Sequence, residues 1–135
     1  MKGRRLVDTN LIVRYLVQDD EKHAKAAGKL IEACDRGEME IVILPVVLAE
    51  SVFVLESFYR RPRPDIAEVL KSLITGPGVE ISEPTVHFDA LDRYGRTKIH
   101  FVDCLIAATA AAEDLPVASF DRDFRKFADA RVETQ

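Results

Sequence analysis

The sequence is poor in the residues that specialised small folds depend on. Its 135 residues include no tryptophan and only two cysteines, Cys34 and Cys104. Two cysteines so far apart favour neither a disulfide framework nor a thiolate zinc site, so we expect two reduced thiols in a cytoplasmic protein. No apolar run approaches the ~18 residues that a membrane span requires, and Asp8 and Arg14 interrupt the stretch that a signal peptide would need. We therefore expect neither secretion nor membrane insertion.

The chain also lacks an excess of positive charge. It has 19 Lys and Arg residues against 23 Asp and Glu residues, which gives a formal net charge of −4 at pH 7. A generic nucleic-acid binder carries the opposite sign. If four of the 23 acids gathered around divalent cations, the other 19 would balance the 19 basic residues. The negative excess could therefore belong to one site rather than to the whole surface.

The chain does contain an alternation of strand-like and helix-like segments, without an internal repeat or linker, so we interpret residues 1–135 as one domain. Strands that alternate with helices favour an α/β fold, a three-layer α/β/α sandwich with a central, mostly parallel sheet. Apolar spacing predicts a helix that Thr9 or Asn10 caps and that continues to Leu16, and another that Asp65 caps and that continues to about 74. Further helices are predicted at 22–36, 46–58, 85–98, 102–113 and 122–128. The predicted strands are 5–7, 41–44, 79–81, 117–120 and an edge strand at 132.

Four acidic residues stand out from the solvated majority: Asp8, Glu50, Asp103 and Asp121. Glu50 interrupts the run VVLAESVFVL, and a helix that is apolar nearly all round should be buried, where an unpaired carboxylate is costly. Each of the other three has an ordinary structural explanation. Asp8 can close a strand, Asp103 can cap a helix, and Asp121 can form a turn in SFDRDF.

Taken together, the four acids favour a metal site. Ligands of a parallel sheet bind beyond the carboxyl ends of its strands, and Asp8 and Asp121 fall at two such ends. Four converging carboxylates cannot all stay ionised unless cations neutralise them. Oxygen ligands without nearby Cys or His suit Mg²⁺ or Mn²⁺ rather than zinc. Such a metal can activate water to attack a phosphodiester, so the acids favour hydrolysis of nucleic acid.

Four sequence blocks then point to a family: LVDTNLIVRYL, LPVVLAESVFVL, FVDCLIAATA and VASFDRDF, in that order, with an acid at each expected point. In these blocks the chain resembles the PIN-domain ribonucleases, particularly the VapC-type toxins of bacterial toxin–antitoxin pairs, and the resemblance covers nearly the whole chain. It implies a PIN-like fold and an endoribonuclease that needs Mg²⁺ or Mn²⁺ and cuts RNA. It also implies a small antitoxin whose tail enters the acidic groove, and a homodimer.

The resemblance also assigns roles to individual positions. The family's four catalytic acids correspond to Asp8, Glu50, Asp103 and Asp121. Of these, Asp8, Asp103 and Asp121 correspond to metal ligands. Residues that support the site by orienting carboxylates or water correspond to Asn10, Ser119 and, as a subsidiary fifth acid, Asp123. RNA must approach this acidic site, so positive charge should flank it. Candidates are Arg60, Arg61 and Arg63, Arg14 on the first helix, and Arg122, Arg125 and Lys126 after the fourth acid, although a solvated loop and ordinary surface pairs explain the Arg60–Arg63 cluster equally well.

Two other functions remain open. A phosphoryl-transfer domain of receiver or haloacid-dehalogenase type also places an aspartate at the end of its first strand. The dehalogenase pattern needs a second Asp where this chain has Asn10, and the receiver pattern needs an acceptor Asp on a middle strand, which here ends before Pro45. A non-catalytic PIN-like module that binds RNA or a partner would tolerate the loss of an acid, whereas this chain has all four.

Overall fold

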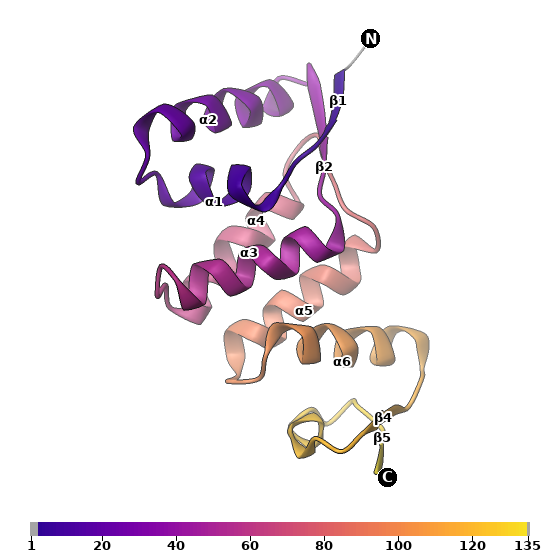
Figure 1. The fold of residues 1–135 in the computed structure, drawn as a ribbon. Helices are drawn as coiled ribbons and strands as arrows, with labels where there is room; N and C mark the ends of the chain where they lie inside the picture. Colours follow the sequence, from indigo (N-terminus) through magenta and orange to yellow (C-terminus); the bar gives the residue numbers. More distant parts are fainter. Residues whose placement is uncertain (1–2, 135) are drawn as a thin grey trace.

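The computed structural model describes residues 3–134, which form helices and short strands arranged along one long axis (Figure 1). The helices are α1 (Thr9–Val17), α2 (Glu21–Asp35), α3 (Pro45–Ser57), α4 (Arg63–Ile74), α5 (Pro84–Arg96), α6 (Phe101–Glu113) and the short 3-10 helix η1 (Arg122–Lys126). The strands are β1 (Gly3–Leu6), β2 (Met39–Val42), β3 (Val79–Glu80), β4 (Val117–Ser119) and β5 (Val132–Thr134). The predicted α/β class is confirmed. Within residues 3–134, the helices are too short or too polar to traverse a lipid bilayer.

Local chemistry explains where the helices begin. Asp8 caps α1, since its Oδ1 accepts a hydrogen bond from the Leu11 N–H at 2.9 Å, so the predicted cap at Thr9 or Asn10 is wrong. Helices α3, α4 and α5 each have a proline in their first two positions, where the missing N–H leaves no intrahelical bond unmade. Asp65 lies in the first turn of α4 and is not its cap residue as predicted.

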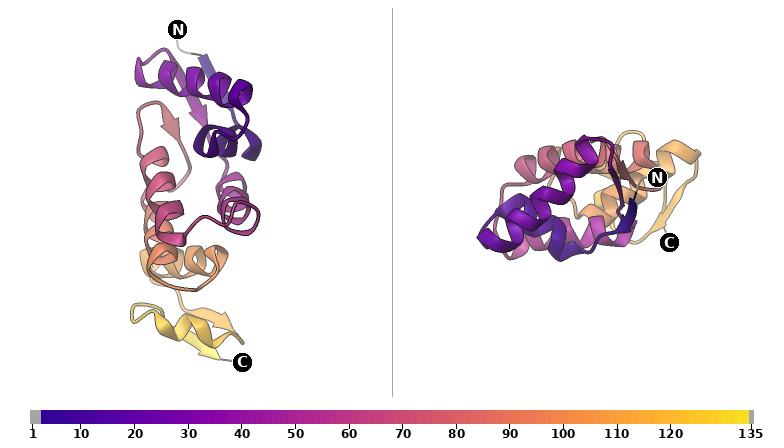
Figure 2. Two further views of the ribbon diagram at one scale, coloured as in Figure 1. Left: turned by 90° about the vertical axis from the view of Figure 1, so that its left-hand side faces the viewer. Right: turned by 90° about the horizontal axis from the view of Figure 1, so that it is seen from above.

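All strand pairs are parallel, as predicted, but the strands form two sheets instead of one. In the first sheet β2 lies between β1 and β3, with Gly3 opposite Met39. In the second sheet β4 pairs with β5, with Val117 opposite Val132. The two sheets lie at opposite ends of the molecule, with α3, α5 and α6 between them (Figures 1 and 2). The predicted central sheet is therefore divided.

One hydrophobic core connects the helices that separate the sheets. Ile41 and Ile43, on and just after β2, are fully buried, as are Leu70 of α4 and Leu91 of α5. Helices α4 and α5 approach closely at Gly95, where an added Cβ would lie 2.7 Å from the Ala67 Cβ. This close packing fixes the distance between the N-terminal and C-terminal parts of the chain.

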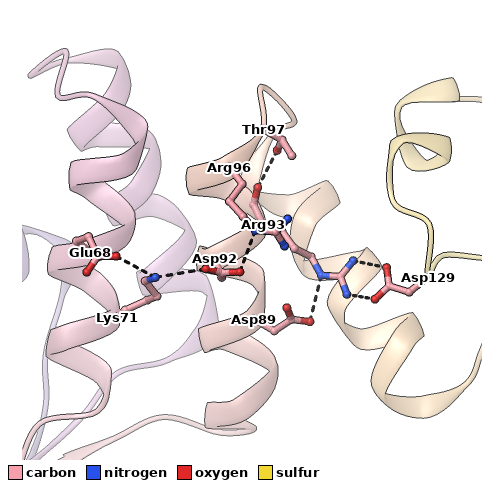
Figure 3. Close-up of polar contacts among 8 residues, drawn as sticks. All are labelled: Glu68, Lys71, Asp89, Asp92, Arg93, Arg96, Thr97 and Asp129. Carbon is pink, nitrogen blue, oxygen red and sulfur yellow. Dashed lines mark hydrogen bonds and ion pairs between the residues drawn. The ribbon is translucent and has the colours of Figure 1, made fainter.

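Arg93 of α5 anchors the C-terminal segment to this helical core (Figure 3). Its side chain is 6% exposed, and its Nε donates to Asp89 at 3.1 Å. Its two terminal nitrogens donate to the two carboxylate oxygens of Asp129, and these hydrogen bonds lower the pKa of Asp129. The guanidinium also lies over the Phe127 ring. Residues after β4 are thereby held against α5.

Candidate functional site

The candidate site residues lie in two groups. We call Asp8, Asn10 and Glu50 the N-terminal group, because they lie on β1, α1 and α3 or the turns beside them. We call Asp103, Ser119, Asp121 and Asp123 the C-terminal group, because they lie on α6, β4 and η1 or the turn between them. Among residues 3–134, no three His, Cys, Asp or Glu side chains gather closely enough to hold a metal ion. A single chain therefore does not bring the four acids together.

The N-terminal group borders a pocket between α1 and α3. The pocket has a volume of about 430 Å³, and Asn10 and Glu50 both line it, together with Thr9, Val13, Val54, Phe58 and Tyr59. Asp8 lies at the start of α1, two residues before Asn10, where it caps that helix. The pocket thus presents one carboxylate and one amide on mostly apolar walls, beside a second carboxylate at the helix N-terminus.

Glu50 is exposed, so the prediction that its carboxylate is buried is wrong. Helix α3 buries one side, which includes Leu48 and Val52, and leaves the other side open. On the open side Val46 and Phe53 are 69% and 67% exposed, one turn before and after Glu50. The apolar run therefore reflects a second apolar surface, with Glu50 in its middle, and not a fully buried helix.

Asp103 is partly buried, whereas Asp121 of the same group is exposed. Asp103 lies in the first turn of α6, and the cap residue of that helix is His100. Burial raises the pKa of Asp103, and the negative charge of Asp121 raises it further. Asp103 therefore does not cap α6, although its place in the first turn favours the helix dipole as predicted. A carboxyl group that burial and a second carboxylate both shift is typical of functional sites.

Asp121 shapes the turn that holds it near Asp103. Its backbone N–H donates to the Ser119 Oγ at 2.9 Å, and its Oδ1 accepts from the Asp123 N–H at 2.8 Å. Asp123 forms an ion pair with Lys126 at 3.3 Å. The turn interpretation of Asp121 is therefore confirmed, and the turn places three acids of the C-terminal group within electrostatic reach of one another.

The structure adds a residue that the sequence analysis missed beside the pocket. Asp19 follows α1 and accepts hydrogen bonds from Arg14 Nη1 at 2.8 Å and from the Tyr59 hydroxyl at 3.0 Å. These bonds tie α1 to the end of α3. Asp19 lies in an ordinary polar loop, and its sequence context carries no signal for this role.

Arg63, one of the candidate positive charges for RNA, has a structural role. Its Nη1 donates to Glu56 at 3.0 Å, and its other nitrogens donate to backbone oxygens of Tyr94, Thr97 and Ile99. Its guanidinium lies 3.8 Å from the centre of the Tyr94 ring. These contacts join the loop before α4 to the end of α5.

The chain is similar to a known protein family and to individual known proteins. The model of the PIN domain family matches residues 5–130. A VapC ribonuclease of Aquifex aeolicus (strain VF5) is 27% identical over 123 residues, which cover 90% of this chain and 90% of that protein. The crystal structure of VapBC2 from Rickettsia felis bound to a DNA fragment from their promoter aligns with 97% of this chain and 98% of that chain, at 19% identity and a TM-score of 0.37.

Proposed function

This chain belongs to the PIN domain family, and we propose that it is an endoribonuclease that requires Mg²⁺ or Mn²⁺. The similarity to a protein named as a VapC ribonuclease supports RNA as the substrate. The observation that most supports catalysis is Asp103 itself, a half-buried acid whose pKa is raised by burial and by the negative charge of Asp121. We assign Asp8, Glu50, Asp103 and Asp121 as the acids of this site.

Mg²⁺ and Mn²⁺ prefer oxygen ligands such as carboxylates, and each of the four acids offers carboxylate oxygens. Within one chain, however, residues 3–134 hold no group of three such side chains. Asp103 and Asp121 alone are too few for a complete metal site, so the arrangement in a single chain does not fit the metal. Further ligands must reach the C-terminal group before it can bind a cation firmly.

We extend the proposal to a biological role as the toxin of a toxin–antitoxin pair. The name of the similar protein supports this role. A small antitoxin that carries an arginine would neutralise the close Asp103 and Asp121 carboxylates, because a guanidinium binds carboxylates through paired hydrogen bonds. The two cysteines are free and buried, which agrees with a cytoplasmic location.

The experiment is an RNA cleavage assay with the purified chain. We expect cleavage with Mg²⁺ or Mn²⁺, loss of cleavage with a chelator, and loss in Asp8→Asn and Asp103→Asn variants that still fold. Asp114→Asn is the matched control, because Asp114 is an exposed acid that pairs with Arg131 outside both groups. Sequencing the RNA ends after induced expression would identify the substrate. Cleavage that persists in both site variants, or that is absent from the wild-type chain, rejects the proposal.

A further inference from the structure

The pocket between α1 and α3 has an aromatic end. Phe58 and Tyr59, which follow α3, line this end, and Phe58 is 76% exposed. Val13 and Val54 add apolar surface to the walls. The pocket volume of about 430 Å³ suits a small planar group. An aromatic ring left open in such a pocket is typical of a binding site.

The two rings are held in place by contacts with each other and with α1. Their centroids lie 4.9 Å apart and their planes meet at 73°, which is an edge-to-face contact. The Tyr59 hydroxyl donates to Asp19, which also accepts from Arg14 of α1. The backbone N–H groups of Phe58 and Tyr59 both donate to the Val54 oxygen. Rings fixed in this way lose little conformational freedom when a ligand stacks on them.

The remaining walls of the pocket carry polar groups, those of Thr9, Asn10 and Glu50. Within residues 3–134, none of these three side chains forms a hydrogen bond or an ion pair. A hydroxyl and an amide can each donate and accept hydrogen bonds, as the edge of a nucleobase requires. The pocket therefore combines an aromatic ring for the face of a base with polar groups for its edge.

Two exposed arginines, Arg60 and Arg61, directly follow Tyr59 along the chain. In the part of the chain that the structure describes, neither side chain forms an ion pair or a hydrogen bond, whereas Arg63 forms several. Arg60 has a φ of 54°, in the left-handed region where residues other than glycine are strained, and such strain is common at functional sites. Two unneutralised guanidinium groups favour a polyanion such as RNA over an apolar segment of a protein.

We infer that this pocket binds an unpaired base of the RNA substrate, which stacks on Phe58 while Arg60 and Arg61 contact the neighbouring phosphates. The bases of double-stranded RNA are already paired and stacked, so only a single-stranded stretch offers a base to the ring. Glu50 lines the same pocket and Asp8 lies beside it, so a base held there positions the strand at two of the proposed acids. The inference rests on the proposed function, because the ligand is the substrate of that function.

The first test uses the absence of tryptophan from the sequence. Phe58→Trp introduces a single indole, and a base that stacks on it quenches its fluorescence. The variant, which also carries Asp103→Asn to prevent cleavage, is titrated in Mg²⁺ with a single-stranded RNA dodecamer that contains all four bases. Phe53→Trp in the same background is the matched control, because Phe53 lies on the same helix, is 67% exposed and does not line the pocket.

We expect the single-stranded RNA to quench Phe58→Trp, and we expect no quenching in Phe53→Trp. The same RNA annealed to its complement should quench neither variant. Equal quenching in the two variants, or no quenching in Phe58→Trp, overturns the inference.

The second test measures the affinity of the same RNA, labelled with fluorescein, by fluorescence anisotropy. Phe58→Ala should weaken binding by about 5- to 150-fold, the contribution of one stacked base, and Phe53→Ala should not. Arg60→Gln and Arg61→Gln should each reduce the slope of log affinity against log salt concentration by about 0.7, the value for one phosphate contact. Lys29→Gln, which removes an equal charge from an exposed position on α2, should leave the slope unchanged.

The oligomeric state distinguishes RNA from a protein partner at this pocket. We expect wild type and Phe58→Ala to sediment alike. If Phe58→Ala changes self-association but leaves the affinity for RNA unchanged, the ring belongs to a protein contact and the inference fails.

Cleavage kinetics separate this inference from the proposed function. Stacking on Phe58 is present in the ground state and in the transition state alike, so Phe58→Ala should raise KM and leave kcat nearly unchanged. If the wild-type chain cleaves RNA and Phe58→Ala keeps the same KM, the inference fails and the proposed function stands. If the wild-type chain does not cleave RNA, the proposed function fails, while quenching and anisotropy still decide whether the pocket binds an unpaired base.

Discussion

Asp129→Asn should weaken the attachment of the C-terminal segment to α5. The substitution leaves at least one donor of the buried Arg93 guanidinium without its carboxylate partner, and such a loss costs about 1–3 kcal/mol. The Asp129 side chain is 55% exposed, so water and screening place the cost at about 1–2 kcal/mol. For a domain of this length, that lowers the melting temperature by roughly 3–8 °C.

The control is Asp114→Asn, which removes a second ion pair between an arginine and an aspartate near the C-terminus, that of Asp114 with Arg131. Its partner Arg131 is 63% exposed, so we expect a loss below about 0.5 kcal/mol. Thermal melts followed by circular dichroism measure both variants. Equal losses of stability in Asp129→Asn and Asp114→Asn would refute the reasoning that the burial of Arg93 determines how much stability is lost.

The effect of Asp129→Asn should also depend on pH. The hydrogen bonds from Arg93 hold the folded-state pKa of Asp129 below its usual value. Its contribution to stability is therefore complete above the unfolded-state pKa and is lost as the pH falls through the folded-state pKa. The difference in the free energy of unfolding between wild type and Asp129→Asn should be large at pH 7 and should become smaller in acid. A difference that widens in acid contradicts the pairing.

The remaining predictions concern single positions. Gly78→Ala should destabilise the protein by about 1–3 kcal/mol in urea unfolding, because Gly78 has a φ of +71° and an added Cβ would lie 2.7 Å from a backbone oxygen of β2. In α2, a Cβ added at Gly28 meets no atom within 4 Å, so Gly28→Ala should stabilise the protein by about 0.5–1 kcal/mol. If Gly28→Ala unfolds at a lower urea concentration than Gly78→Ala, both predictions are contradicted. Asp103→Asn should raise the melting temperature at pH 7, because the raised pKa means that the folded state disfavours the ionised form. This gain should shrink as the pH falls through the folded-state pKa and vanish below the unfolded-state pKa, and a variant that is less stable at pH 7 would contradict it. Cys34 and Cys104 are fully buried, and burial raises the pKa of Cys104 to about 11, so a thiol reagent at pH 8 should react with neither until the protein unfolds.

The helices of this chain could be predicted well because their signals are local. Helix α3 begins at Pro45 and ends at Ser57, within one residue of the predicted range at each end. Strand positions were less exact, since β2 covers Met39–Val42 and not 41–44. Pairing between strands sets these bounds, and a single strand's sequence carries little information about its partners. For the same reason, the sequence does not reveal that the strands divide into two sheets.

The candidate site was predictable in part. The local roles of Asp8 and Asp121, at the end of a strand and in a turn, follow from their own sequence context and are confirmed. The predicted convergence of all four acids is not seen among residues 3–134, where only Asp103 responds electrostatically to Asp121 and Asp123. Glu50 could not be placed from the sequence, because an apolar run does not show whether the apolar side chains of a helix pack in the core of their own chain or lie on its surface.

The central claim is that acids from both ends of the chain act at one metal centre, and Mn²⁺ binding tests it most directly. A titration of the purified chain with Mn²⁺, followed by electron paramagnetic resonance, would compare wild type, Asp8→Asn and Asp103→Asn. The account predicts that each substitution weakens the same Mn²⁺ site by at least about tenfold. If only the C-terminal substitution weakens binding, or if neither does, acids from the two ends do not share a centre.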